Sequence, residues 1–253
     1  MSIKENIIQF QKEIPDKVTL VAVSKTKPIS DLQEAYDSGQ RIFGENKVQE
    51  MSEKWEQLPK DIQWHMIGHV QTNKVKQMVE YVSLIHSADR LKLFKEINKQ
   101  AAQVDRTIDV LLQVKIAQEE SKYGMPIQEA TALLDGNQLD NYPNVRVVGL
   151  MGMASFTDDT NQVDTEFKML ESLFIRFRES KNLKILSMGM SGDYELAIEN
   201  GSTMIRVGSA IFEYGIIGRN NYQINKIYKI VVSYTLLYAT STYPMMFDLL
   251  ILK

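Results

Sequence analysis

A lysine at position 25 follows a run of apolar residues in VTLVAVSKTKP, residues 18–28. Ligands of α/β proteins bind at the carboxyl ends of parallel strands, so a lysine directly after a strand should lie on the rim of a binding site. On a regular strand Val21 and Val23 would share its face, and this apolar collar would disfavour the charged ammonium. Because a neutral amine attacks an aldehyde, Lys25 is a candidate Schiff-base lysine. The alternative is a lysine that extends into water beside Lys27.

Two glycine-containing turns have the composition of an anion site. In LSMGMSGDYELAIENG, Ser191 and Gly192 precede a predicted helix, and in IRVGSAIF, Gly208 and Ser209 follow a predicted strand. Glycine lets backbone N–H groups approach an anion, and Ser191 can cap the helix or donate its hydroxyl. Barrel proteins commonly bind phosphate with the loops after strands seven and eight. The alternative is ordinary turn glycines and a capping serine.

Two further polar residues are candidates for a ligand site. Arg206 lies inside the apolar run TMIRVG, and a buried guanidinium needs a partner, either a core carboxylate or a ligand ring. Asn46 closes FGEN at the end of another apolar run, where it either binds a ligand or caps the next helix.

The remaining chemistry-bearing residues are expected to be structural. Of the three histidines His65, His69 and His86, only the first two have a ligand-like spacing, and a structural role is favoured over a metal site. Glu119 and Glu120 are expected to form a solvated loop pair. Four methionines are expected to fill the core: Met151, Met153, Met188 and Met190.

Eight short apolar runs, each followed by an amphipathic stretch, must position these residues. The predicted strands are Val18–Ser24, Arg41–Glu45, Trp64–Gly68, Ser83–Ser87, Asp109–Ile116, Val145–Met153, Leu183–Met190 and Thr203–Phe212. Three helices are predicted from their start signals: a capping box at Ser30, an N-cap at Asp89, and a proline at the first helical position, Pro126. Two more are predicted over Gln162–Glu179 and Asp193–Asn200. Eight such units predict an α/β fold with a single closed (β/α)8 TIM barrel, and the alternative is an open doubly wound sheet.

Composition limits the class of protein. The chain has 253 residues, a net charge of -3 and no cysteine, which argues against nucleic acid binding and excludes disulfides and thiolate catalysis. We expect no secretory signal, and we expect the protein to be cytoplasmic. We predict one domain, residues 1–214, followed by an atypical apolar extension, residues 215–253. Residues 230–252 are long enough for a membrane span, but Asp248, Pro244 and many polar residues make a packed or poorly ordered appendage the expectation.

Several motifs occur in an order that resembles a known family. VAVSKTKP, FGEN, WHMIG with QTNK, SKYG, GLMGM, SMGMSGD and GSTMIRVGSAIF together resemble the pyridoxal phosphate homeostasis proteins, the YggS/PROSC family, over residues 3–212. The resemblance implies a barrel like the N-terminal domain of alanine racemase, with an N-terminal helix packed against it. It implies pyridoxal 5′-phosphate held as an internal aldimine on Lys25, with Lys27 and Lys122 as lower-ranked alternatives. The other implied cofactor contacts are Asn46 and Arg206 at the ring and Ser191, Gly192, Gly208 and Ser209 at the phosphate.

The resemblance also bears on activity. An arginine at the ring nitrogen disfavours its protonation and weakens the electron sink, and nothing after residue 212 resembles the second domain of alanine racemase. We therefore expect a carrier or buffer of vitamin B6, with apo-enzymes and amino acids as further partners. The alternatives are an amino-acid racemase or another pyridoxal phosphate enzyme of low activity, and a barrel whose ligand site has decayed. Glu213 stands where the family has glycine, and residues 213–253 indicate an unusual extension or a shifted reading frame.

Overall fold

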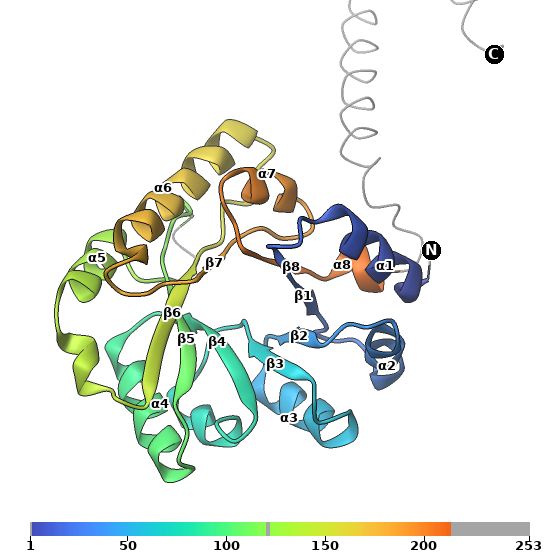
Figure 1. Ribbon diagram of the computed structural model, residues 1–253, viewed down its shortest axis with the longest axis horizontal. Coiled ribbons are helices and arrows are strands. Elements are labelled where there is room, and N and C mark those ends of the chain that lie inside the picture. Colours follow the sequence, from blue (N-terminus) through green and yellow to red (C-terminus); the bar gives the residue numbers. More distant parts are fainter. Residues whose placement is uncertain (1, 120–121, 214–253) are drawn as a thin grey trace, which may run out of the picture. The chain divides into compact units, whose positions relative to one another are not determined.

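The computed structural model describes residues 2–119 and 122–213. These residues form a closed barrel of parallel strands in the order β1 to β8, in which β1 pairs with β8 (Figure 1). The strands are β1 (Thr19–Val23), β2 (Ile42–Glu45), β3 (Gln63–Met66), β4 (Val82–Ala88), β5 (Ile108–Gln113), β6 (Val145–Met151), β7 (Ile185–Ser187) and β8 (Met204–Val207). The predicted (β/α)8 barrel is confirmed, and the open doubly wound sheet is wrong.

The chain divides into two units, Met1–Tyr214 and Gly215–Lys253. The predictions for the extension, for the apolar stretch 230–252 and for Glu120 lie outside the described residues. Within the described ranges, no helix is both long enough and apolar enough to cross a membrane.

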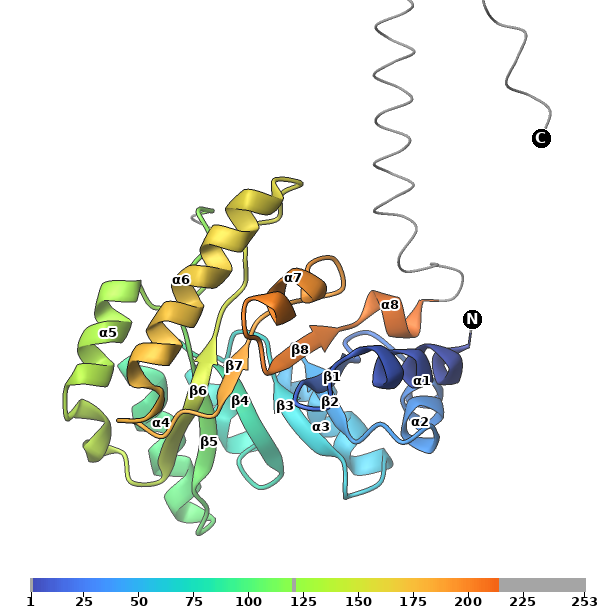
Figure 2. The same ribbon diagram turned by 45° about the horizontal axis from the view of Figure 1, so that its top comes forward.

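Helices surround the barrel (Figures 1 and 2). The α-helices are α1 (Ile3–Glu13), α2 (Ile29–Asp37), α3 (Val48–Gln57), α4 (Leu91–Gln103), α5 (Ile127–Asp135), α6 (Thr160–Arg178), α7 (Tyr194–Glu199) and α8 (Ser209–Phe212), and the 3₁₀ helices are η1 (Thr72–Gln77) and η2 (Gln138–Asn141). The prediction from sequence did not include η1 or η2.

The N-terminal helix α1 packs on the barrel beside α2 and α8 (Figure 2). It begins with a capping box, in which the Ser2 hydroxyl accepts from the Glu5 amide and the Glu5 carboxylate accepts from the Ser2 amide. Asn6 on its buried face donates from Nδ2 to the carbonyl of Ile211 at 2.9 Å. The predicted N-terminal helix is therefore present, and a buried hydrogen bond joins it to the segment after β8.

The apolar core has two shells. A large outer shell fills the space between strands and helices, and a small cluster fills the barrel interior with Val21, Leu84, Leu111, Met151 and Met204. Of the methionines expected in the core, Met151 and Met188 are buried, whereas Met153 and Met190 are half-buried.

Several predicted boundaries are wrong. β8 ends at Val207, because the chain turns into α8 at Ser209 instead of continuing to Phe212. β7 ends at Ser187, and soon after it Gly189 adopts a φ of 97°, which L side chains rarely adopt. The caps differ too: α2 and α4 begin after Pro28 and Arg90, so Ser30 and Asp89 are not N-caps. The strands nevertheless lie where the apolar runs placed them.

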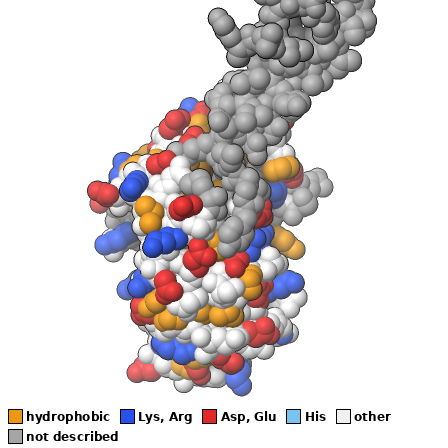
Figure 3. Space-filling view, turned by 90° about the vertical axis from the view of Figure 1, so that its right-hand side faces the viewer, with side chains coloured by type: hydrophobic (Ala, Val, Ile, Leu, Met, Phe, Trp, Pro, Cys, Tyr) orange, Lys and Arg blue, Asp and Glu red, His pale blue; other side chains and the backbone are white. Residues whose placement is uncertain are grey.

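Charge is distributed evenly over the visible surface. On the part of the face in Figure 3 that grey atoms do not cover, basic and acidic side chains are interspersed. This agrees with the small net charge of -3.

Candidate functional site

The predicted site residues come together at the carboxyl ends of neighbouring strands. Lys25 follows β1, Asn46 follows β2, Gly208 follows β8, and the Ser191–Gly192 turn follows β7. In the closed barrel β1 lies between β2 and β8, and β7 is next to β8. One rim therefore carries the candidate amine and both glycine turns, as the order of the strands requires.

Lys25 lies at this rim with an exposed side chain, whereas Ser24 before it is buried. Val21 is part of the interior cluster, and Val23 is half-buried against the turn after β8, where a Cβ at Gly208 would lie 3.2 Å from the Val23 Cβ. The apolar collar thus ends short of the lysine head. The reasoning that burial would desolvate Lys25 is wrong, but its place beside the Gly208 turn is as expected.

The two glycine turns contact each other. The Gly208 amide donates to Ser191 Oγ at 3.3 Å, which joins the loops after β7 and β8. Ser191 does not cap α7, whose N-cap is Asp193, and Asp193 Oδ1 accepts from the Met190 amide. Burial raises the pKa of Asp193, and the hydrogen bond from Met190 opposes that shift.

Donors at these turns face open space. A Cβ at the exposed Gly192 would meet no atom within 4 Å. Among the described residues, the amides of Gly192 and Ser209 have no hydrogen-bond acceptor, and both residues are exposed. Because α7 and α8 are only six and four residues long, the helix dipoles add little to these backbone donors. Two free amides and a serine hydroxyl are donors of the kind that a phosphate accepts from.

Arg206 is buried in β8 and makes hydrogen bonds to neutral groups. Its Nη1 donates to Ser187 Oγ at 2.6 Å, and its Nη2 donates to the carbonyl of Gly152 at 3.0 Å. Burial lowers the pKa of Arg206 to about 10, so it remains charged at neutral pH, and Asp193 acts in the opposite direction. No carboxylate among the described residues forms an ion pair with Arg206. The attraction of a carboxylate to Arg206 is therefore limited, in this part of the chain, to Asp193, which acts on it without a direct ion pair.

A chain of buried hydrogen bonds extends from Arg206 through the barrel interior. Ser187 Oγ lies 3.3 Å from His86 Nδ1, and His86 Nε2 lies 3.0 Å from His65 Nδ1. Burial lowers the pKa of His65 to about 3 and that of His86 well below its usual value, so both rings are neutral at neutral pH. We call Arg206, Ser187, His86 and His65 the interior relay.

The predictions from sequence do not include the interior relay, because they consider only the spacing of His65 and His69 and favour a structural role for these residues. His69 instead stacks on Tyr123 and lies 3.4 Å from Asp89. The sequence contains part of the signal, since His65 and His86 occupy neighbouring predicted strands, but whether the two rings meet depends on the register of those strands. No group of three or more His, Cys, Asp or Glu side chains that could hold a metal ion occurs in the described residues.

The other candidate residues, Asn46, Lys27 and Lys122, each contact a neighbouring residue. Asn46 is half-buried, and its backbone packs so closely on Gly68 that a Cβ there would lie 2.3 Å from the Asn46 carbonyl oxygen. Lys27 lies 4.0 Å from Glu213, and Lys122 lies 3.9 Å from Glu119. The Glu119 carboxylate also accepts from the Phe156 amide, so this residue of the predicted solvated pair is tied to a neighbouring loop.

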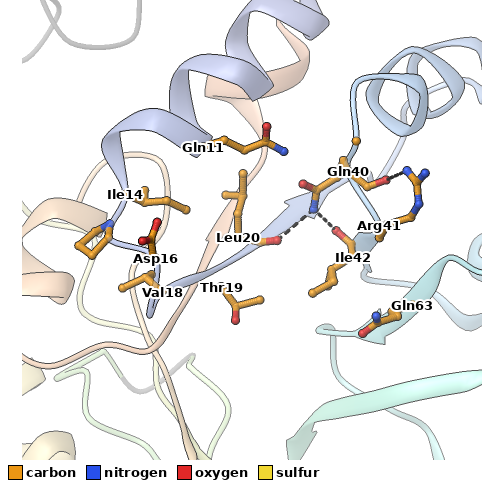
Figure 4. A pocket seen from close by; sticks show the side chains of 12 residues that line it. Gln11, Ile14, Asp16, Val18, Thr19, Leu20, Gln40, Arg41, Ile42 and Gln63 are labelled. Atoms are coloured by element: carbon orange, nitrogen blue, oxygen red, sulfur yellow. Dashed lines mark hydrogen bonds between the residues drawn. The ribbon is translucent and has the colours of Figure 1, made fainter.

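A pocket of about 350 Å³ lies at the opposite end of the barrel (Figure 4). It is lined by the end of α1 and by the amino ends of β1, β2 and β3. Gln40 spans part of it and donates from Nε2 to the carbonyls of Leu20 and Ile42, at 3.0 and 2.6 Å. None of the predicted site residues lines this pocket, so we place the site at the carboxyl rim.

Comparison with known proteins gives a consistent result. Residues 1–215 match the family described as alanine racemase, N-terminal domain. The pyridoxal phosphate homeostasis protein of Pasteurella multocida is 37% identical over 228 residues, which cover 84% of this chain and 97% of that protein. The Escherichia coli protein of the same name is 36% identical over 206 residues, 78% of this chain and 86% of that one.

Solved structures are similar over the same region. Synechococcus elongatus PipY with pyridoxal phosphate bound is 34% identical with a TM-score of 0.76, and the match covers 83% of this chain and all of PipY. The alanine racemase of Corynebacterium glutamicum has a TM-score of 0.70 at 14% identity, over 86% of this chain and 63% of the racemase. The racemase likeness shows the fold alone.

Proposed function

The chain belongs to the alanine racemase N-terminal domain family and, within it, to the pyridoxal phosphate homeostasis proteins, and we propose that it binds pyridoxal 5′-phosphate as a Schiff base on Lys25. One observation carries the proposal: the barrel brings Lys25 and the two glycine turns to the same rim. In this proposal the protein acts in the cytoplasm as a carrier or buffer of vitamin B6. Its further partners are apo-enzymes that need the cofactor and amino acids whose amines displace Lys25.

The residues at the rim fit the groups of this cofactor. The free amides of Gly192 and Ser209, with Ser191 beside Gly208, suit a phosphate monoester. In this proposal the Arg206 guanidinium, which is bonded only to neutral partners among the described residues, faces the ring nitrogen, and Asn46, which follows β2, is the other contact at the ring. When bound, the cofactor would supply an aldehyde, and Lys25 would be the residue whose amine holds it.

The state of Arg206 favours a carrier over an enzyme. Pyridoxal phosphate enzymes that stabilise carbanions strongly keep the ring nitrogen protonated with a carboxylate. In this proposal Arg206, which remains charged at neutral pH and is bonded to Ser187 and to the Gly152 carbonyl, takes that position instead of a carboxylate. The likeness to alanine racemases lies below 25% identity and adds no argument for racemisation.

An absorption spectrum tests the proposal. Wild-type protein mixed with pyridoxal phosphate should give a Schiff-base band in the violet, and Lys25→Ala should abolish it. Lys27→Ala is the matched control, because Lys27 lies two residues away and is directed at Glu213, and it should retain the band. A wild-type protein without the band, or a Lys25→Ala variant that keeps it, would contradict the proposal. Rapid exchange of the α-proton of an added L-amino acid into deuterium would contradict the carrier role.

A further inference from the structure

Three charged side chains from β2 and α3 contact the loop that carries Lys25. Glu45 ends β2, and Glu50 and Lys54 lie four residues apart on α3. Lys54 Nζ lies 2.7 Å from Glu45 Oε1 and 2.7 Å from Glu50 Oε1. The Lys54 and Glu45 side chains are buried, and that of Glu50 is 23% exposed. We call these three residues the clamp.

The clamp is bonded to the backbone on both sides of Lys25. Lys54 Nζ donates to the Ser24 carbonyl at 2.7 Å, and Glu50 Oε1 accepts from the Thr26 amide at 2.5 Å. The Ser24 carbonyl belongs to the peptide that precedes the Lys25 Cα, and the Thr26 amide belongs to the peptide that follows it. The two partners of one ion pair therefore hold both peptide planes that flank this Cα.

Further contacts make the loop conformation specific. The Ser24 hydroxyl donates to Glu45 Oε1 at 2.6 Å, the same oxygen that Lys54 contacts. Thr26 has a φ of 63°, a conformation seldom found for β-branched residues unless the surrounding structure imposes it. Burial raises the pKa of Glu45, while Lys54 and Ser24 act in the opposite direction. A buried group of this kind resists rearrangement, since loss of one partner leaves another charge uncompensated.

We infer that the clamp positions Lys25 for condensation with an aldehyde, and that Glu50 and Lys54 are positioning residues that do not touch the ligand. The inference rests on the proposed function and extends it to the residues behind the amine. The Lys25 side chain is exposed and flexible, so the fold controls the reach of its Nζ chiefly by fixing its Cα. Because the loop is ordered before the ligand binds, the complex does not lose the conformational entropy that ordering the loop would cost.

Two ligands separate positioning of the amine from general damage. Pyridoxal phosphate can condense with Lys25, whereas pyridoxine 5′-phosphate has an alcohol in place of the aldehyde and cannot. We expect Glu50→Ala to bind pyridoxal phosphate at least about tenfold more weakly and pyridoxine phosphate within about twofold of wild type. Glu50→Gln keeps an oxygen acceptor for the Thr26 amide and should be intermediate. Glu56→Gln, the same change on the exposed side of α3, should match wild type.

A second measurement needs no ligand. Residue-resolved hydrogen exchange of the protein alone should show the Thr26 amide exchanging about tenfold faster in Glu50→Ala than in wild type or Glu56→Gln. Lys54→Met should have the same effect on exchange and on binding. Because loss of its buried cation can prevent folding, the half-buried Glu50 carries the decisive comparison.

The outcomes distinguish the inference from the proposed function. A wild-type protein with no Schiff-base band contradicts the proposed function, and the inference with it. A wild-type band together with unchanged pyridoxal phosphate affinity in Glu50→Ala overturns the inference alone. Equal weakening of both ligands shows a purely structural role and overturns it as well, as does unchanged exchange of the Thr26 amide.

Discussion

Acidification should destabilise this barrel through the interior relay. Burial lowers the pKa of His65 from 6.5 to about 3, and that of His86 shifts in the same direction. Such histidines bind protons more readily in the unfolded chain, so the stability they confer is present above pH 6.5 and is lost as pH falls towards the folded-state value. Between pH 7 and pH 5 the folded-state ring of His65 stays neutral while the unfolded one titrates.

The size of the effect follows from those values. One pH unit is worth about 1.4 kcal/mol per proton, and about 1.5 units separate pH 5 from the unfolded-state pKa, so His65 alone should remove about 2 kcal/mol from the free energy of unfolding. His86 adds to the loss in the same direction. The value for His65 is insensitive to its folded-state pKa as long as that pKa lies below about 4.

Urea denaturation at pH 7, 6 and 5 measures this loss, with the fluorescence of the buried Trp64 as a probe. Acidic groups also contribute to the loss of unfolding free energy between pH 7 and pH 5. The informative quantity is therefore the difference in this loss between a variant and wild type. His65→Asn keeps a polar group near His86 Nε2 but cannot titrate, and its loss between pH 7 and pH 5 should be about 2 kcal/mol smaller than that of wild type. His69→Gln, which alters a half-exposed ring outside the relay, should lose as much as wild type. An identical loss in His65→Asn and wild type would refute the reasoning.

Two predictions concern the packing of the barrel. Gly149→Ala should lower the free energy of unfolding by about 3 kcal/mol or more in urea denaturation, because its Cβ would lie 1.9 Å from the Ile185 carbonyl oxygen and would force β6 and β7 apart. The control Gly192→Ala has open space at the Cβ, so its free energy of unfolding should stay within about 0.5 kcal/mol of wild type. Equal losses in the two variants would contradict the prediction. Asn6→Ala should cost about 1–2 kcal/mol in the same assay, because it leaves the Ile211 carbonyl without its partner. Gln9→Ala should cost far less, because the Gln9 side chain bonds to Glu13 at the end of the same helix, and a neutral Asn6→Ala would show that α1 docks without the bond to Ile211.

The sequence was sufficient for the fold and for the location of the rim. Apolar runs at regular intervals specify the strands, and parallel strands in a closed barrel place every residue that follows a strand at one end. Lys25, Asn46 and Gly208 were therefore placed correctly without any knowledge of register. The boundaries failed where backbone geometry and not hydrophobicity decides, as at Gly189 with its φ of 97°.

The interior relay could not be derived in this way, because it depends on register. The pairing of β3 with β4 shifts between Trp64 and His65, so that His65 is opposite Leu84 and His86 lies two residues further along β4. A pattern of apolar and polar residues contains no information about such a shift. The exposure of Lys25 was missed for a related reason: strand alternation gives the face on which a side chain lies but not its height above the rim.

The clamp holds the loop that carries Lys25, and the interior relay holds the side chain of Arg206 inside the barrel. Loops are the more mobile parts of a barrel, yet a binding site needs its groups ordered before the ligand arrives. Here the loop of Lys25 is fixed from outside by Lys54 and Glu50, and Arg206 is fixed from inside by Ser187, which contacts His86. Both supports begin on strands or on a helix packed against them, so the amine and the guanidinium share the rigidity of the barrel. The inner support is neutral apart from Arg206 itself, because burial lowers the pKa of both histidines and leaves their rings uncharged at neutral pH.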